Sequence, residues 1–170
     1  MNYPLVWRTG ALLAGLLMLS LPGLAKDRAY VQPFIGAVDL GQPQKDSQYG
    51  VQYISGQGWT RFDLQPHLGL LRTRHGSHLL YTGVSRYSSF APGDEGLALV
   101  VEFGPGLYLH GGGADTDLGF PLQFRTSGGL VYEFADATRV GVHFSHLSNA
   151  SLAEENPGTE LLTFTYGLAF

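Results

Sequence analysis

The stretch Leu97-Ala-Leu-Val-Val-Glu-Phe-Gly-Pro-Gly-Leu-Tyr-Leu109 decides the fold, because its two alternating sets of residues differ in polarity. The odd positions are all apolar, whereas the even positions carry Glu102 and Tyr108 among small residues. Successive side chains of a strand point to opposite sides of the sheet. One face therefore suits lipid, and the other suits the interior of a barrel. The stretch predicts one strand of a transmembrane β-barrel.

The same alternation recurs along the rest of the chain. It is clear in residues 120–134, where Phe124 and Tyr132 oppose Arg125 and Glu133, and in residues 59–71. A barrel of this size fills its interior with side chains and has no wide channel. We therefore predict an all-β protein, an eight-stranded antiparallel transmembrane β-barrel. The remaining five strands are expected at 30–38, 48–56, 77–87, 138–149 and 160–170.

Segments rich in Gly and Asp separate these strands and predict the connections between them. If both chain ends lie on the periplasmic side, the connections at 88–95 and 135–137 and the tight turn at Gln57-Gly58 are periplasmic. A soluble eight-stranded barrel of the lipocalin type is the alternative, and it would place apolar residues inside. Charged residues on the more polar face of the predicted strands favour the transmembrane barrel. The terminal Phe170 also favours it, because it resembles the assembly signal of outer-membrane proteins. The outer loops are then expected at 41–47, 72–76, 111–119 and 150–159.

The N-terminal residues predict export from the cytoplasm. Arg8 precedes an apolar run at 11–20, and Gly23 and Ala25 supply small residues for a cleavage site. The run is too short for a spanning helix, although a retained membrane anchor is the alternative. We expect a signal peptide at 1–25 and an outer-membrane β-barrel domain at 26–170. The chain has no Cys, and its net charge of −4 gives no basic patch for nucleic acid.

Three polar residues fall on the apolar faces of the last two predicted strands. His146 and Ser148 continue the face of Val140, Val142 and Phe144, and Glu160 begins the face of Leu162 and Phe164. Pairing His146 with Glu160 would bring all three onto one patch. Taken alone, His146 is also consistent with a residue at the level of the lipid headgroups, and Glu160 with a solvated strand end. A charge near the membrane interface costs only about 0–1 kcal/mol.

Together the three residue types complement one another chemically. A serine hydroxyl needs a base to become nucleophilic, and an imidazole needs a carboxylate to hold its tautomer. We therefore predict Ser148 as nucleophile, His146 as base and Glu160 as the residue that orients the base. Asn149, next to the nucleophile, is expected to help stabilise an oxyanion together with backbone N–H groups.

The stretch His146-Leu-Ser-Asn-Ala150, followed by Asn156-Pro157-Gly158 and then Glu160, resembles the PagL family of lipid A 3-O-deacylases. The resemblance covers the last two predicted strands closely. It implies an eight-stranded barrel whose active site faces lipid A in the outer leaflet of the outer membrane. It also implies the roles given above, with Asn149 at the oxyanion hole. It implies no metal or organic cofactor, and it is compatible with homodimers. Ser151 departs from the family pattern, in which Gly is expected.

Other functions remain open at this point. A non-enzymatic outer-membrane barrel for adhesion or surface protection is one, although the expected outer loops are short. A lipid A acyltransferase or a phospholipase on a similar barrel is another. The other histidines show no metal-ligand spacing, and His67 and His143 are expected to face the lumen. These histidines are His67, His75, His78, His110 and His143.

Overall fold

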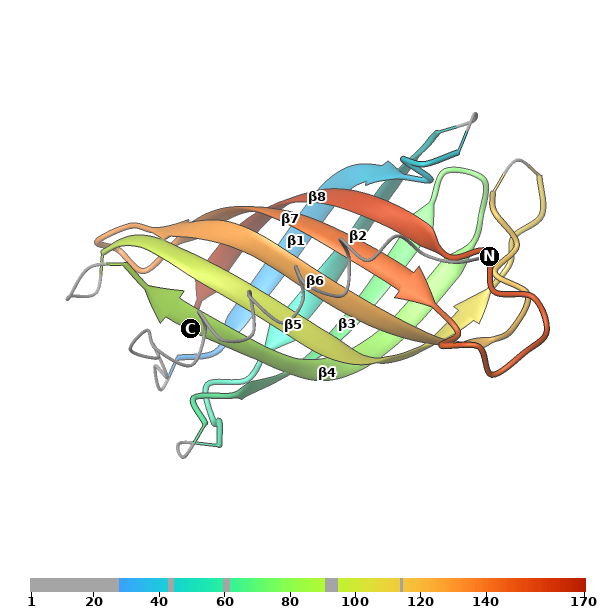
Figure 1. The fold of residues 1–170 in the computed structure, drawn as a ribbon. Coiled ribbons are helices and arrows are strands. Elements are labelled where there is room, and N and C mark those ends of the chain that lie inside the picture. Colours follow the sequence, from blue (N-terminus) through green and yellow to red (C-terminus); the bar gives the residue numbers. More distant parts are fainter. Residues whose placement is uncertain (1–27, 43–44, 60–61, 91–94, 114) are drawn as a thin grey trace.

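The structure is a computed structural model that describes residues 28–42, 45–59, 62–90, 95–113 and 115–170. The expected signal peptide at 1–25 lies outside these residues. Each strand pairs with the next in antiparallel fashion, and β8 pairs with β1, so that the sheet closes into a barrel (Figure 1). No helix in the described ranges is long and apolar enough to cross a membrane. The strands are β1 (Tyr30–Val38), β2 (Asp46–Ile54), β3 (Gln65–Thr73), β4 (His78–Ser89), β5 (Gly96–Leu109), β6 (Leu122–Glu133), β7 (Arg139–Ser148) and β8 (Thr159–Ala169).

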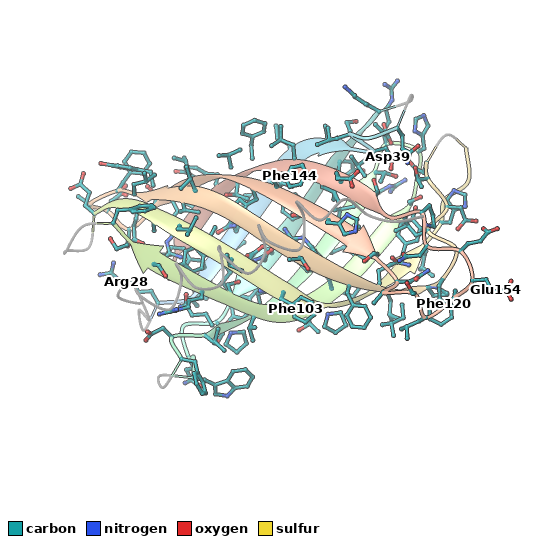
Figure 2. All side chains as sticks on the ribbon, in the orientation of Figure 1. Arg28, Asp39, Phe103, Phe120, Phe144 and Glu154 are labelled. Carbon is teal, nitrogen blue, oxygen red and sulfur yellow. The ribbon has the colours of Figure 1, made fainter. Side chains whose placement is uncertain are left out.

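The barrel carries its apolar side chains outside, as the alternation predicts. In β5, Val100 and Glu102 are buried in the lumen, whereas Phe103 and Leu107 are more than half exposed. Figure 2 shows Phe103 and Phe144 on the outer wall. The predicted eight-stranded antiparallel barrel is therefore confirmed. The interior holds charged and amide side chains beside two clusters of apolar ones, whereas the outer wall is rich in exposed apolar side chains, which a soluble barrel would not have.

The lumen is closed by a hydrogen-bonded polar cluster. Glu102 accepts hydrogen bonds from Gln52 Nε2 (2.8 Å), Ser85 Oγ (3.1 Å) and Arg125 Nη1 (2.7 Å). Tyr81 donates to the Oε1 atom of Gln52 at 2.8 Å, and the Arg125 guanidinium lies over the Tyr81 ring. The cavity beside this cluster measures only about 10 Å³. Because that is the space of about one water molecule, the lumen cannot admit an acyl chain.

The two lumen-facing histidines are confirmed in their predicted positions. His67 is buried, and its Nδ1 atom lies 2.7 Å from Ser85 Oγ. His143 is buried as well, and its Nε2 atom lies 3.3 Å from Thr165 Oγ1.

Several strand boundaries differ from the prediction, most of them by one or two residues. The segment expected as a strand at 59–71 begins only at Gln65, and the turn expected at Gln57-Gly58 is longer, joining Ile54 to Gln65. Trp59 N donates to Leu64 O at 2.8 Å, and Asp63 has a positive φ of 52°, so the chain reverses where the alternation runs on. β2 begins at Asp46, inside the expected loop at 41–47, and β4 extends to Ser89. The alternation of polar and apolar residues continues through this reversal and does not reveal it. For this reason the sequence predicts the start of β3 too early.

The connections divide between the two ends of the barrel. Residues 39–45, 74–77, 110–121 and 149–158 connect strands at one end, which we call the loop end (Figure 1). The C-terminus and the other three connections lie at the opposite end, the turn end. β7 finishes at Ser148 and β8 begins at Thr159, so the predicted catalytic residues lie at the loop end.

We expect Arg125→Met to destabilise the barrel by about 3–5 kcal/mol, because it leaves the buried Glu102 carboxylate without its cation. The double variant Glu102→Gln/Arg125→Met removes both charges and should lose less. The difference is measured by unfolding each refolded variant with urea in detergent, while circular dichroism monitors the loss of strand structure. A double variant that is less stable than Arg125→Met alone would show that the ion pair does not dominate this cluster.

Candidate active site

The pairing of β7 with β8 brings His146 opposite Glu160, in the register that the sequence predicts. Both side chains point to the outer wall, on the face of Phe144 and Leu162, which are themselves a cross-strand pair. Paired residues of neighbouring antiparallel strands have Cβ atoms about 4.5–5.5 Å apart. The imidazole and the carboxylate are therefore held within reach of each other by the sheet itself.

The His146 ring and the Glu160 carboxylate form an ion-pair contact with 3.3 Å between Nδ1 and Oε1. The two side chains are 46% and 34% exposed, so the pair is accessible from outside the barrel. A carboxylate at Nδ1 favours the tautomer that carries its proton there, which leaves Nε2 as the acceptor. Gly158, at φ 64°, keeps this ring edge free, since a Cβ there would lie 3.0 Å from His146 Cε1.

Ser148 lies two residues beyond His146 on the same outer face and is partly exposed. A strand rises about 3.3 Å per residue, so the two Cα atoms are about 7 Å apart and their side chains are neighbours. On the other side Ser148 pairs with Phe124 of β6, whose ring stacks on that of Phe103. The structure thus brings Ser148, His146 and Glu160 together on an apolar part of the wall.

Asn149 is fully buried, and its side chain is engaged within the protein. Nδ2 donates to Glu155 O at 2.7 Å and to Leu118 O at 3.4 Å, while Oδ1 accepts from Ser151 N at 2.9 Å. The backbone N–H of Asn149 donates to Asn156 Oδ1 at 3.0 Å. In this conformation the carboxamide therefore holds the loop at 149–158 in place and does not point to the nucleophile.

The residues after Asn149 have an unusual backbone. Ala150 and Ser151 have positive φ angles of 54° and 64°. A left-handed conformation costs a residue with a Cβ roughly 1–2 kcal/mol, whereas Gly adopts it freely. This gives a physical reason for the Gly expected at the position of Ser151.

Asp39 supports the start of β8, next to Glu160, and the sequence analysis did not identify this residue. Its Oδ1 accepts from Thr159 Oγ1 at 2.6 Å, and its Oδ2 accepts from Thr116 N at 3.3 Å. Leu40 N donates to Glu160 O at 3.3 Å. Figure 2 shows Asp39 at the loop end. The one sequence signal is an Asp directly after a strand, and its contacts depend on the closure of β1 onto β8.

The candidate catalytic residues are separate from any potential metal ligands. Among the described residues, the one group of His, Asp and Glu close enough to hold a metal ion is Asp46, His75 and Asp115. None of the three belongs to the His146–Glu160 pair.

Comparison with known proteins gives the following similarities. Residues 34–169 match the protein family described as Lipid A 3-O-deacylase (PagL). The chain is 29% identical over 122 residues to Lipid A deacylase PagL of Bordetella bronchiseptica (strain ATCC BAA-588 / NCTC 13252 / RB50), covering 68% of this chain and 67% of that protein. The fold is similar to the crystal structure of the outer membrane enzyme PagL, with a TM-score of 0.68, 23% identity and coverage of 82% and 98% of the two chains. It is also similar to a de novo designed transmembrane β-barrel, with a TM-score of 0.56, 12% identity and coverage of 85% and 97%.

We expect Asn149→Ala to loosen the loop at 149–158. The change leaves the carbonyls of Leu118 and Glu155 without their donor, and an unpaired buried polar group costs about 1–3 kcal/mol. Hydrogen–deuterium exchange should speed up in peptides that cover 149–158 and stay unchanged in β4. Leu152→Ala is the matched control, because that side chain is exposed in the same loop. Unchanged exchange in Asn149→Ala would contradict the role of the carboxamide in holding the loop.

Proposed function

The chain belongs to the PagL family of lipid A 3-O-deacylases, and on that premise we propose that it is an outer-membrane esterase that removes the 3-O-linked acyl chain of lipid A. In this proposal Ser148 is the nucleophile, His146 is the general base and Glu160 orients the base. The observation that carries the proposal is the 3.3 Å contact between His146 and Glu160 on the outer wall, with Ser148 on the same face.

The first half of the reaction forms an acyl-enzyme. His146 Nε2 takes the proton of the Ser148 hydroxyl as Oγ attacks the carbonyl carbon of the ester. The Glu160 carboxylate stabilises the imidazolium that forms. As the tetrahedral intermediate collapses, the bond to the sugar oxygen breaks, and that oxygen takes the proton from His146. The 3-hydroxyl of the sugar is released, and the acyl chain stays on Ser148.

The second half releases the fatty acid. His146 takes a proton from a water molecule, whose oxygen attacks the acyl carbon. When this second tetrahedral intermediate collapses, Ser148 Oγ takes the proton back from His146 and the free acid leaves. The site lies near the end of β7 and the start of β8, so the water of this step enters from the loop end. The same base therefore serves both steps without a cofactor.

For the oxyanion we propose the turn that begins at Asn149. Within this turn the N–H groups of Asn149, Ser151 and Leu152 already donate to oxygens of the loop, so the donor that we propose is the backbone N–H of Ala150. Asn149 fixes the turn through its bonds to Glu155 and Ser151. A direct bond from the carboxamide to the oxyanion would require the release of one of its present carbonyl partners.

The outer wall supports a location in the outer membrane. Its exposed side chains are apolar along the strands, as the hydrocarbon layer requires. Aromatic residues gather near the turn end, where an interfacial girdle is expected. These exposed aromatics are Tyr53, Trp59, Phe62, Phe90, Tyr132, Phe134 and Phe170. With the turn end in the periplasm, the candidate catalytic residues face the outer leaflet, where lipid A resides.

We expect Ser148→Ala and His146→Ala to lower deacylase activity by several orders of magnitude, because the two residues act as a unit. Glu160→Ala should be about one to two orders less severe, because Glu160 orients the base and does not react. The assay is the loss of one 3-hydroxyacyl chain from purified lipid A, read by mass spectrometry. Ser145→Ala is the control, since this serine of the same strand faces the lumen.

Two results would count against this proposal in different ways. Full activity in Ser148→Ala would refute the serine mechanism, whatever the substrate. Cleavage of phospholipid by the unmodified chain, with lipid A left intact, would keep the mechanism and remove the substrate assignment.

The membrane location predicts a labelling pattern. The chain has no native Cys, so single Cys residues can be placed cleanly. Leu99→Cys and Phe124→Cys should react with a lipid-phase maleimide in reconstituted vesicles, whereas Ser127→Cys, which faces the lumen, should not. The reverse pattern would exclude a lipid-exposed outer wall.

A further inference from the structure

Three loop-end segments bring two carboxylates and one imidazole to a single point. Asp46 begins β2, His75 lies in the connection between β3 and β4, and Asp115 lies in the connection between β5 and β6. The potential ligand atoms of the three residues all lie within 4.8 Å of one another. The three residues are far apart in the sequence, so no motif spacing indicates them.

The distances from His75 to the two carboxylates lie close to the edges of a tetrahedral metal site, one of them slightly shorter. His75 Nδ1 lies 3.0 Å from Asp46 Oδ2 and 3.6 Å from Asp115 Oδ1. Zinc binds imidazole nitrogen and carboxylate oxygen at about 2.0–2.2 Å, so a tetrahedron of such bonds has edges of about 3.3–3.6 Å. A metal ion can therefore be placed between these atoms with small side-chain movements.

One of the ligand atoms has no hydrogen-bond partner. The Asp115 side chain is only 2% exposed, and its Oδ1 atom is buried without a hydrogen bond. Its Oδ2 atom, in contrast, accepts from Thr73 Oγ1 at 2.6 Å and from Ser77 N at 3.1 Å. Asp115 therefore directs a buried oxygen without a hydrogen bond at His75.

We propose that Asp46, His75 and Asp115 bind a zinc ion that joins three of the loop-end segments. As metal ligands, one neutral imidazole and two carboxylates together carry a charge of −2, which a divalent cation cancels. One imidazole with two carboxylates suits zinc, whereas calcium and magnesium prefer six or more oxygen ligands. His75 is partly exposed, which gives the ion a path of entry and leaves room for a water molecule as fourth ligand. The role is structural, since no candidate catalytic residue belongs to the site.

The surrounding packing shows that the site is built on segments already in close contact. Gly111 N donates to Ser77 Oγ at 2.9 Å, and Tyr108 OH donates to the same oxygen at 3.1 Å. Gly111 packs so closely against Gly76 that a Cβ would not fit. Bound zinc would therefore add to a contact that exists without it, and its removal should leave the barrel folded.

The test is calorimetric titration of zinc chloride into the untagged chain, refolded in detergent and stripped with EDTA. We expect one zinc ion to bind per chain. Bound zinc should also raise the temperature at which the folded barrel unfolds, read on gels from the loss of its heat-modifiable band. Changes outside the ligand set of a metal site already cost about 10–100-fold in affinity, so His75→Gln and Asp115→Asn should each weaken binding at least about tenfold. His78→Gln is the matched control and should bind as the unmodified chain does.

His75→Gln keeps the proposal testable if Asp115→Asn fails to fold, because the His75 side chain is the most exposed of the three. Absence of zinc binding to the unmodified chain would overturn the proposal. So would binding that His75→Gln leaves unchanged, or binding of calcium in preference to zinc.

Discussion

The ladder between β1 and β8 is the interaction on which the rest of the structure depends. Within hydrocarbon every backbone N–H and C=O group must find a partner inside the protein, so a membrane sheet has to close. The ladder runs from Tyr30, opposite Ala169, to Ala37, opposite Leu162. It also brings Asp39, just beyond β1, to Thr159 at the start of β8. Closure of the barrel thus supports the strand that carries Glu160.

Closure with eight strands also determines where chemistry can take place. The interior is narrow, and Glu102, Arg125 and their partners leave a cavity of only about 10 Å³. No acyl ester can enter such a lumen, so a reactive group that meets lipid has to stand on the outer wall. On that wall a polar side chain costs least near the ends of the strands. His146 and Glu160 lie there, and the register of β7 with β8 places their side chains next to each other.

The sequence predicts those features that depend on alternation within a strand or on pairing across one hairpin. These include the faces of β5 and β6, the opposition of His146 and Glu160, and the lumen positions of His67 and His143. It fails where the contact joins segments that are distant in the chain. Asp39 needs the closing ladder, and the cluster of Asp46, His75 and Asp115 needs three loops to meet. The buried position of Asn149 follows from contacts with Leu118 and Glu155 in two different loops, which alternation does not address.

At the loop end, these contacts between distant segments are linked to one another by hydrogen bonds and by neighbouring positions in the chain. Asp115 is followed in the chain by Thr116, whose N–H donates to Asp39, and Asp39 accepts in turn from Thr159, next to Glu160. On the other side of the site, Asn149 joins the β5–β6 connection at Leu118 to the loop that follows Ser148. The β5–β6 connection therefore contacts the supports of both the carboxylate and the nucleophile. Through Thr116 and Leu118 this connection links the two supports, and catalysis requires that the reacting side chains keep a defined geometry.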